Sequence, residues 1–224
     1  MRRVAVRKSK GSQSPFTADP FSPITENQAT SYKAFRQGKH LIHTGYSGTG
    51  KTYLACAFAA EALNSADIMS IRVMRSAVAS RDIGFLPGTE AEKMAAYERP
   101  YVDTFNTIFG RGDAYSLLKQ KGILTFESSS FQRGMTYKNT FIIVDEIQNM
   151  TFQELYSIVT RISEGSRLIF CGDTRQTDLA KGSGFERFAS VAGALPQWFV
   201  CIDFGIKDIV RHDLVRDFIM QVEA

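Results

Sequence analysis

Eight consecutive residues, Gly45 to Thr52, have the types and spacing of a loop that binds phosphate. The segment GYSGTGKT fills the pattern GxxxxGK[ST] at every fixed position. Its glycines let backbone N–H groups curl around a phosphate, Lys51 can reach the β- and γ-phosphates, and the Thr52 hydroxyl can hold Mg²⁺. A chance glycine-rich turn before a helix is the alternative. The residues predicted to surround the nucleotide here are Gly45, Tyr46, Ser47, Gly48, Thr49, Gly50, Lys51, Thr52 and Tyr53.

Two adjacent carboxylates, Asp145 and Glu146, follow the apolar run 141–144. In sheets of parallel strands, active groups lie at the carboxyl ends of the strands, where these two residues fall. Asp145 suits the Mg²⁺ shell through water, and Glu146 could orient and deprotonate an attacking water. An acidic pair alone is a weak signal. Downstream of an intact phosphate loop, it predicts a hydrolytic site.

A third polar segment, with the pattern GDxxQ, follows the apolar run 167–171 and ends at Gln176. If this run is a strand between the phosphate-loop strand and the Asp145 strand, Gln176 would point at the γ-phosphate. A neutral amide there could report whether ATP or ADP is bound. The alternative is an ordinary turn, because Gly-Asp is common in turns.

The elements that must position these groups alternate between strands and helices. We predict strands at 40–44, 67–73, 123–126, 141–144, 167–171 and 198–202. Helices are expected at 53–63 and 185–191, after capping boxes at 89–92 and 151–154, and along a C-terminal apolar face. Pro100 predicts a break or kink in the helix that follows residues 89–92. The C-terminal apolar face comprises Leu214, Val215, Phe218, Ile219 and Val222. The alternation predicts an α/β fold with a mostly parallel sheet and helices on both faces.

Length and charge suggest one domain and a basic tail. A chain of 224 residues with 44% hydrophobic content can bury one substantial core. Residues 1–20 carry five basic side chains against one acidic, or +4, whereas the remainder has 27 − 5 = 22 basic and 23 − 1 = 22 acidic. We therefore predict a flexible tail at 1–20, either solubilising or nucleic-acid-binding, and a folded domain at 21–224.

Composition also limits the environment of the chain. No apolar stretch approaches the roughly 20 residues of a membrane span, so we expect a soluble, cytoplasmic protein with no membrane partner. The three cysteines, Cys56, Cys171 and Cys201, lack CxxC spacing and are predicted to be buried thiols.

The order of phosphate loop, VDEIQN and GDxxQ resembles the core of superfamily 1 helicases. The detailed match is to the PhoH-like ATPase family, especially its short bacteriophage members, over roughly residues 23–220. This resemblance implies a single RecA-like P-loop NTPase domain and, for a phage protein, a location in the host cytoplasm. The supporting segments are 23–28, 74–78, 84–88, 131–136, 145–149, 172–178 and 208–212.

The resemblance implies roles for two further residues. Gln28 matches the family glutamine that reads the adenine edge, where an amide can both donate and accept, which would favour ATP. Arg211 resembles the helicase arginine that touches the γ-phosphate, and its fixed planar charge suits a developing phosphoryl charge. A surface cation at a helix start is the alternative for Arg211. The chain departs from the family at Ser76, often Pro, and at Ile147, often Ala.

Helicases of this superfamily close the nucleotide between two RecA-like lobes, whereas this chain is expected to have a single lobe. The resemblance implies a homo-oligomeric ring, a hexamer, in which a neighbouring subunit supplies the missing face and an arginine finger. Candidate fingers are Arg75, Arg133 and Arg175. Arg75 and Arg133 could equally contact single-stranded RNA or DNA, with Phe85 or Phe131 stacking on bases.

The predicted function is Mg²⁺-dependent ATP hydrolysis coupled to action on single-stranded nucleic acid, RNA more than DNA. The predicted catalytic residues are Lys51, Glu146, Gln176 and Arg211, with Thr52 and Asp145 at the metal. An ATP-gated oligomeric interaction module without translocation or unwinding is the alternative. A small-molecule kinase fits less well, because a water-activating base is unwanted where phosphate passes to another acceptor.

Overall fold

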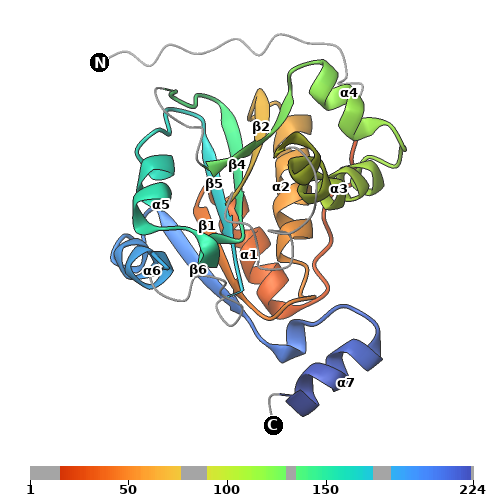
Figure 1. Cartoon of the computed structure of the whole chain (residues 1–224), viewed down its shortest axis with the longest axis vertical. Helices are drawn as coiled ribbons and strands as arrows, with labels where there is room; N and C mark the ends of the chain where they lie inside the picture. Colours follow the sequence, from red (N-terminus) through yellow and green to blue (C-terminus); the bar gives the residue numbers. More distant parts are fainter. Residues whose placement is uncertain (1–15, 77–89, 130–134, 174–182, 223–224) are drawn as a thin grey trace.

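A six-stranded parallel sheet forms the centre of the molecule (Figure 1). The computed structural model describes residues 16–76, 90–129, 135–173 and 183–222. All five strand pairings are parallel, and the strands lie in the order β3-β2-β4-β5-β1-β6. The strands are β1 (His40–Gly45), β2 (Ser70–Arg75), β3 (Leu124–Ser128), β4 (Thr140–Asp145), β5 (Arg167–Cys171) and β6 (Phe199–Phe204). The predicted α/β fold with a parallel sheet is confirmed, although β2 begins three residues later than expected.

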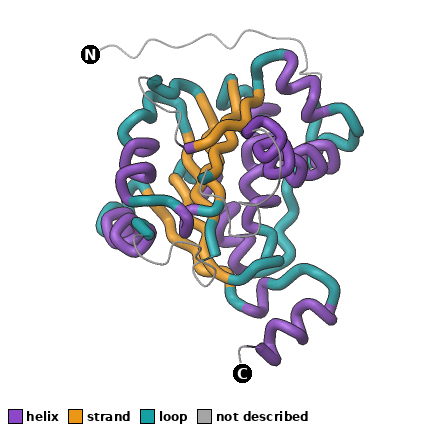
Figure 2. The backbone as a smooth tube through the Cα atoms, viewed as in Figure 1, coloured by secondary structure: helices purple, strands orange, loops and turns teal. Residues whose placement is uncertain are grey.

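Helices cover both faces of the sheet, as Figures 1 and 2 show. Helices α1 to α4 contribute to one core together with alternate strand residues such as Leu41 and Ile143. Helices α5 and α6 close a second core against the intervening residues, such as Ile42 and Val144. The helices are α1 (Glu26–Arg36), α2 (Lys51–Asn64), α3 (Glu90–Ile108), α4 (Ala114–Gln120), α5 (Phe152–Val159), α6 (Phe185–Gly193) and α7 (Asp213–Val222), with short 3₁₀ turns η2 (Ile147–Asn149) and η3 (Ile206–Asp208).

Two helices, α1 and α4, were not predicted from the sequence. Helix α1 has a weak apolar pattern, because two of its four buried residues, Gln28 and Ser31, are polar. Helix α3 runs through Pro100, so of the break or kink predicted there the break does not occur. The predicted capping box at Thr151 and Glu154 is confirmed at the start of α5, whereas the one at 89–92 falls largely outside the described side chains.

The carboxyl ends of β1, β5 and β4 lie side by side at one edge of the sheet, hereafter the carboxyl edge. Strand β5 lies between β1 and β4, which is the arrangement that the sequence argument required. Close packing at this edge explains Gly45: its φ is +107°, and a Cβ there would lie 2.0 Å from the carbonyl oxygen of Phe204 on β6. Only glycine fits where the phosphate loop leaves the sheet.

The packed region includes part of the predicted tail. Phe16 is 2% exposed, and its ring meets that of Phe109 edge-on at 5.7 Å. The core therefore extends to residue 16, and the rest of the predicted tail, 1–15, lies outside the described residues. Among the cysteines, Cys56 and Cys171 are buried as predicted, but the prediction is wrong for Cys201, which is exposed on the edge strand β6.

Helix α7 projects from the body of the molecule (Figure 1). The helix is confirmed, but none of its residues is buried. Leu214, Phe218 and Val222, spaced four residues apart, are 69%, 68% and 69% exposed. Its apolar face is therefore unpartnered within the described chain. None of the described helices is long and apolar enough to cross a membrane.

Candidate nucleotide site

The phosphate loop connects β1 to α2 at the carboxyl edge. Its Lys51 ammonium donates to the carbonyl oxygens of Gly45 and Tyr46 at 2.8 and 2.6 Å, and Thr49 Oγ1 donates to Tyr46 O at 2.9 Å. These bonds hold the lysine inside the curve of the loop. Burial lowers the pKa of Lys51, while nearby anionic groups oppose that shift.

Asp145, at the end of β4, lies beside the first turn of α2. Its Oδ2 atom accepts hydrogen bonds from Thr52 Oγ1 at 3.0 Å and from the Tyr101 hydroxyl at 2.6 Å. Its Oδ1 atom accepts from the backbone N–H of Glu146 at 2.9 Å. The tertiary structure therefore brings together Thr52 and Asp145, the two residues predicted at the metal, although 93 positions separate them in the chain.

Glu146 takes the left-handed conformation, with φ +57° and ψ +42°. Gln148 Nε2 donates to its Oε2 atom, and Arg75 Nη2 lies 3.7 Å from its Oε1 atom. Burial, and then the neighbouring Asp145 charge, raise the pKa of Glu146, while Arg75 and Gln148 act in the opposite direction. A carboxylate that is held in place with a raised pKa has the properties of a general base.

The loop after β5 is tied to the same carboxylate. Gln148 Oε1 accepts from the backbone N–H of Asp173 at 3.1 Å, so one amide side chain joins Glu146 to the start of the GDxxQ segment. A Cβ on Gly172 would lie 2.8 Å from that Oε1 atom, so the close approach requires glycine. Gln176 itself lies outside the described residues, and its predicted role stays a prediction.

Arg211 lies against the phosphate loop. Its Cδ atom is 3.0 Å from the position that a Cβ on Gly48 would occupy, and the neighbouring Val210 N–H donates to Gly48 O at 3.1 Å. The Asp208 carboxylate accepts from Asn27 Nδ2 at 2.7 Å and from Gly205 N at 2.9 Å, which fixes the turn before Arg211. The predicted arginine is thus in the site, from the same chain.

These groups line one cleft of about 460 Å³ at the carboxyl edge. Its lining residues are Ser47, Gly48, Gly50, Lys51, Thr52, Tyr53, Arg75, Pro100, Tyr101, Thr104, Asp145, Glu146, Gly172, Asp173, Val210 and Arg211. A second cavity of about 480 Å³ shares Gly50, Tyr53 and Val210 and is also lined by Gln28. Gln28 is buried, and its Oε1 atom accepts from Ile24 N at 3.0 Å.

Comparison with known proteins agrees with this arrangement. The family model "PhoH-like protein" matches residues 20–223. The chain belongs to the PhoH-like family. It is 35% identical to the PhoH-like protein of Bacillus subtilis, over 87% of this chain and 61% of that one, and 35% identical to protein PhoH of Escherichia coli K12, over 87% and 57%. The chain thus spans about three fifths of the length of these relatives.

A solved structure, that of the Pif1 helicase from Candida albicans, is a more distant match. It shares 18% identity, with a TM-score of 0.40, over 83% of this chain and 40% of that chain. This likeness is too remote to bear on function. This PhoH-like chain thus has the phosphate loop and the parallel sheet that are typical of P-loop NTPases.

The donor set of this PhoH-like chain fits Mg²⁺. The ion prefers hard oxygen ligands and, beside a nucleotide, usually takes only one or two carboxylates together with phosphates and water. Thr52 and Asp145 provide such oxygens in the cleft. Among the described residues, no cluster of three or more His, Cys, Asp or Glu side chains could form an all-protein metal site.

Two site residues were missed by sequence reasoning. Tyr101 lies in the helix predicted after the capping box at 89–92 and had no predicted role, yet its hydroxyl contacts Asp145. Gln148 stood within the recognised segment 145–149 without an assigned role, although an amide two residues after Glu146 was a usable signal. Of the predicted arginines, Arg75 lies in the site, while Arg133 and Arg175, like Phe85 and Phe131, fall outside the described residues.

Proposed function

We propose that this PhoH-like chain binds and hydrolyses ATP with Mg²⁺. The observation that carries the proposal is the convergence, in one cleft, of the phosphate-loop residues Lys51 and Thr52 with the carboxylates Asp145 and Glu146. A phosphate group held by the loop would lie between a cation on one side and a carboxylate able to activate water on the other. That combination favours hydrolysis over simple nucleotide storage.

Each residue of the cleft would have its own role in the reaction. Lys51 would leave the loop carbonyls to donate to the β- and γ-phosphates, and Arg211 would stabilise the charge that develops on the transferred phosphoryl group. Glu146 would orient and deprotonate the attacking water. Thr52 and Asp145 would hold Mg²⁺, which when bound neutralises charge on the phosphate oxygens.

The base-binding part of the site supports ATP as the substrate. Gln28 lines the cavity next to Gly50 and Tyr53, so its amide would be within reach of a base bound beside the phosphate loop. An amide can donate to one ring atom of adenine and accept from its amino group, whereas guanine presents the opposite pattern. We therefore propose that Gln28 selects ATP over GTP.

We further propose that hydrolysis is coupled to single-stranded nucleic acid, RNA more than DNA. The support is Arg75, which lies at the carboxyl edge, partly exposed, and 3.7 Å from Glu146. A strand phosphate that engaged this guanidinium would act on the catalytic carboxylate directly. We propose RNA rather than DNA because of the resemblance to the family.

The test measures ATP hydrolysis with and without single-stranded RNA and DNA, with Glu146→Gln as the inactive control. Stimulation by a strand supports coupling. Hydrolysis that no nucleic acid changes, together with no strand binding at low salt, would exclude coupling and leave the ATPase.

A second candidate is an ATP-gated oligomeric interaction module that neither translocates nor unwinds. The observation in its favour is α7, whose exposed apolar face directly follows Arg211 and the phosphate-loop contact of Val210. A partner bound to α7, including a second copy in the proposed hexameric ring, would be linked to the nucleotide. Hydrolysis per subunit that rises with protein concentration would support a shared site.

A further inference from the structure

We propose that Tyr101 is a positioning residue for the metal-binding carboxylate, acting through Asp145 to set how tightly Mg²⁺ is held with the nucleotide. The inference rests on the proposed function, because it assumes that Mg²⁺ and a nucleotide bind in this cleft. It adds a residue from α3, an element to which the sequence assigned no chemistry.

The hydrogen bonds of Asp145 define what Tyr101 does. Each carboxylate oxygen has two lone-pair positions. On Oδ2, both are used by hydroxyl donors, Tyr101 at 2.6 Å and Thr52 at 3.0 Å. Because Asp145 can only accept, the Thr52 hydrogen points at the carboxylate, and the lone pairs of the Thr52 oxygen are left for a cation. On Oδ1, the Glu146 N–H uses one position, and no other donor from the described part of the chain bonds this atom, so the second position can take a metal-bound water.

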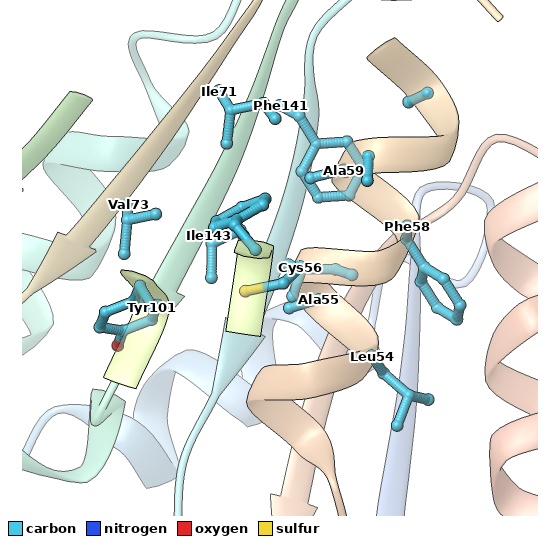
Figure 3. Close-up of a cluster of buried hydrophobic side chains, with 14 of the residues drawn as sticks. Leu54, Ala55, Cys56, Phe58, Ala59, Ile71, Val73, Tyr101, Phe141 and Ile143 are labelled. Atoms are coloured by element: carbon cyan, nitrogen blue, oxygen red, sulfur yellow. The ribbon is translucent and has the colours of Figure 1, made fainter. Parts of the chain in front are cut away.

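Tyr101 also limits the rotation of the carboxylate. The χ2 torsion of an aspartate has a broad, roughly two-fold distribution, so the carboxylate group rotates easily. Hydrogen-bond donors in fixed positions are therefore needed to hold its two oxygens in one plane. Tyr101 is such a donor: it is 1% exposed, and its ring packs 5.4 Å from that of Phe126. Figure 3 shows the ring near Val73 and Ile143, with the hydroxyl pointing away from these aliphatic side chains.

A second buried tyrosine provides a matched control. Tyr115 on α4 is 3% exposed, and its hydroxyl donates to Glu98 at 2.6 Å, outside the cleft. Tyr101→Phe and Tyr115→Phe therefore each remove one buried hydroxyl that bonds a carboxylate, and each leaves the ring in place. Only the first touches Asp145, so a difference between the variants reports on the metal site and not on the loss of a buried hydrogen bond in general.

The experiment measures equilibrium binding of a fluorescent ATP analogue, both in EDTA and as Mg²⁺ is titrated in. For Tyr101→Phe we expect unchanged affinity in EDTA and an increase of about tenfold in the Mg²⁺ concentration that gives half of the metal-dependent gain, as for other residues that orient metal ligands. Tyr115→Phe should match the unsubstituted chain in both conditions.

Three outcomes would overturn the inference. An unchanged Mg²⁺ midpoint in Tyr101→Phe shows that the hydroxyl does not position Asp145, while the proposed function stands. Equal weakening with and without Mg²⁺ shows a general structural effect. If the unsubstituted chain binds no nucleotide, the proposed function fails, and this inference fails with it.

Discussion

Nη2 of Arg75, at the end of β2, lies 3.7 Å from Oε1 of Glu146, the residue directly after β4. The same guanidinium lies over the ring of Tyr97 on α3, 4.5 Å from its centroid. An aromatic face and a carboxylate thus hold one cation in the cleft. Arg75 thus faces the carboxylate of its own chain, and its role as an arginine finger in trans stays a prediction.

Replacement of Arg75 should reduce the electrostatic part of strand binding. In Arg75→Ala we expect the slope of log binding constant against log salt concentration to fall by about 0.7 for a single strand, the contribution of one phosphate contact. Arg75→Lys should keep the slope, because the charge is retained. Arg36→Ala serves as the control, since Arg36 lies at the opposite edge and pairs with Glu61. An unchanged slope in Arg75→Ala would remove Arg75 from the strand interface.

Glu146→Gln should abolish most of the hydrolysis and leave nucleotide binding intact. The amide keeps the shape and can still bond Gln148, but it cannot accept a proton from water. Loss of a general base typically costs a factor of about 10² to 10⁴ in rate. Single-turnover hydrolysis and the equilibrium affinity for an ATP analogue check this. Hydrolysis within threefold of the original rate would contradict the assignment of Glu146 as the base.

Gln28→Ala should reduce the preference for ATP over GTP. Loss of one hydrogen bond to the base costs about 1 kcal/mol, which is roughly a fivefold weaker affinity for ATP with little change for GTP. The ratio of the two affinities is the quantity to measure, because any general disturbance of α1 affects both nucleotides. Gln37→Ala, at the exposed far end of the same helix, is the control. A ratio that stays constant would place the base elsewhere.

Phe218→Ser should weaken self-association if α7 joins subunits. Full burial of a phenylalanine stabilises an interface by about 1.5–3 kcal/mol, so the dissociation constant should rise at least roughly tenfold. Sedimentation velocity over a range of concentrations gives the measurement. Trp198→Ser is a control, because Trp198 is also apolar and 59% exposed but lies before β6, away from α7. An unchanged distribution of masses in Phe218→Ser would show that α7 is not the subunit contact.

The chain should lose stability between pH 8 and pH 5 because of His43. This imidazole is fully buried and bonds Ser31, and burial together with the nearby Lys51 lowers its pKa from 6.5 to about 3. Below pH 6.5 the unfolded chain therefore binds a proton on this imidazole that the folded chain does not bind. The free energy of unfolding decreases as the pH falls. At pH 5 the loss is about 2 kcal/mol.

Urea unfolding at pH 8 and at pH 5 measures this difference in the free energy of unfolding. His40, whose pKa is lowered to about 4 mainly by burial, contributes in the same direction. His43→Gln keeps a partner for Ser31 and should reduce the pH dependence. Equal pH dependence in the His43 variant would contradict this assignment.

The motifs made most of the site predictable. Lys51, Thr52, Asp145 and Glu146 were identified because their chemistry demands fixed residue types at fixed spacing, and both motifs come after a short strand-like run. The alternation of such runs with amphipathic segments also predicted the parallel sheet. Helices α1 and α4 were missed because their buried faces are partly polar or short, so periodicity did not reveal them.

By itself, the sequence determined the chemical groups, the parallel α/β fold and the edge of the sheet where those groups gather, because all of these follow from local pattern. Only the tertiary structure decided which distant residues meet there. Tyr101 and Asp145 are 44 positions apart, and Arg75 ends β2 whereas Glu146 directly follows β4. Strand order and helix packing create such contacts, and no spacing along the chain encodes them. The same holds for α7, whose apolar pattern predicted a helix but could not tell that its face would be left exposed.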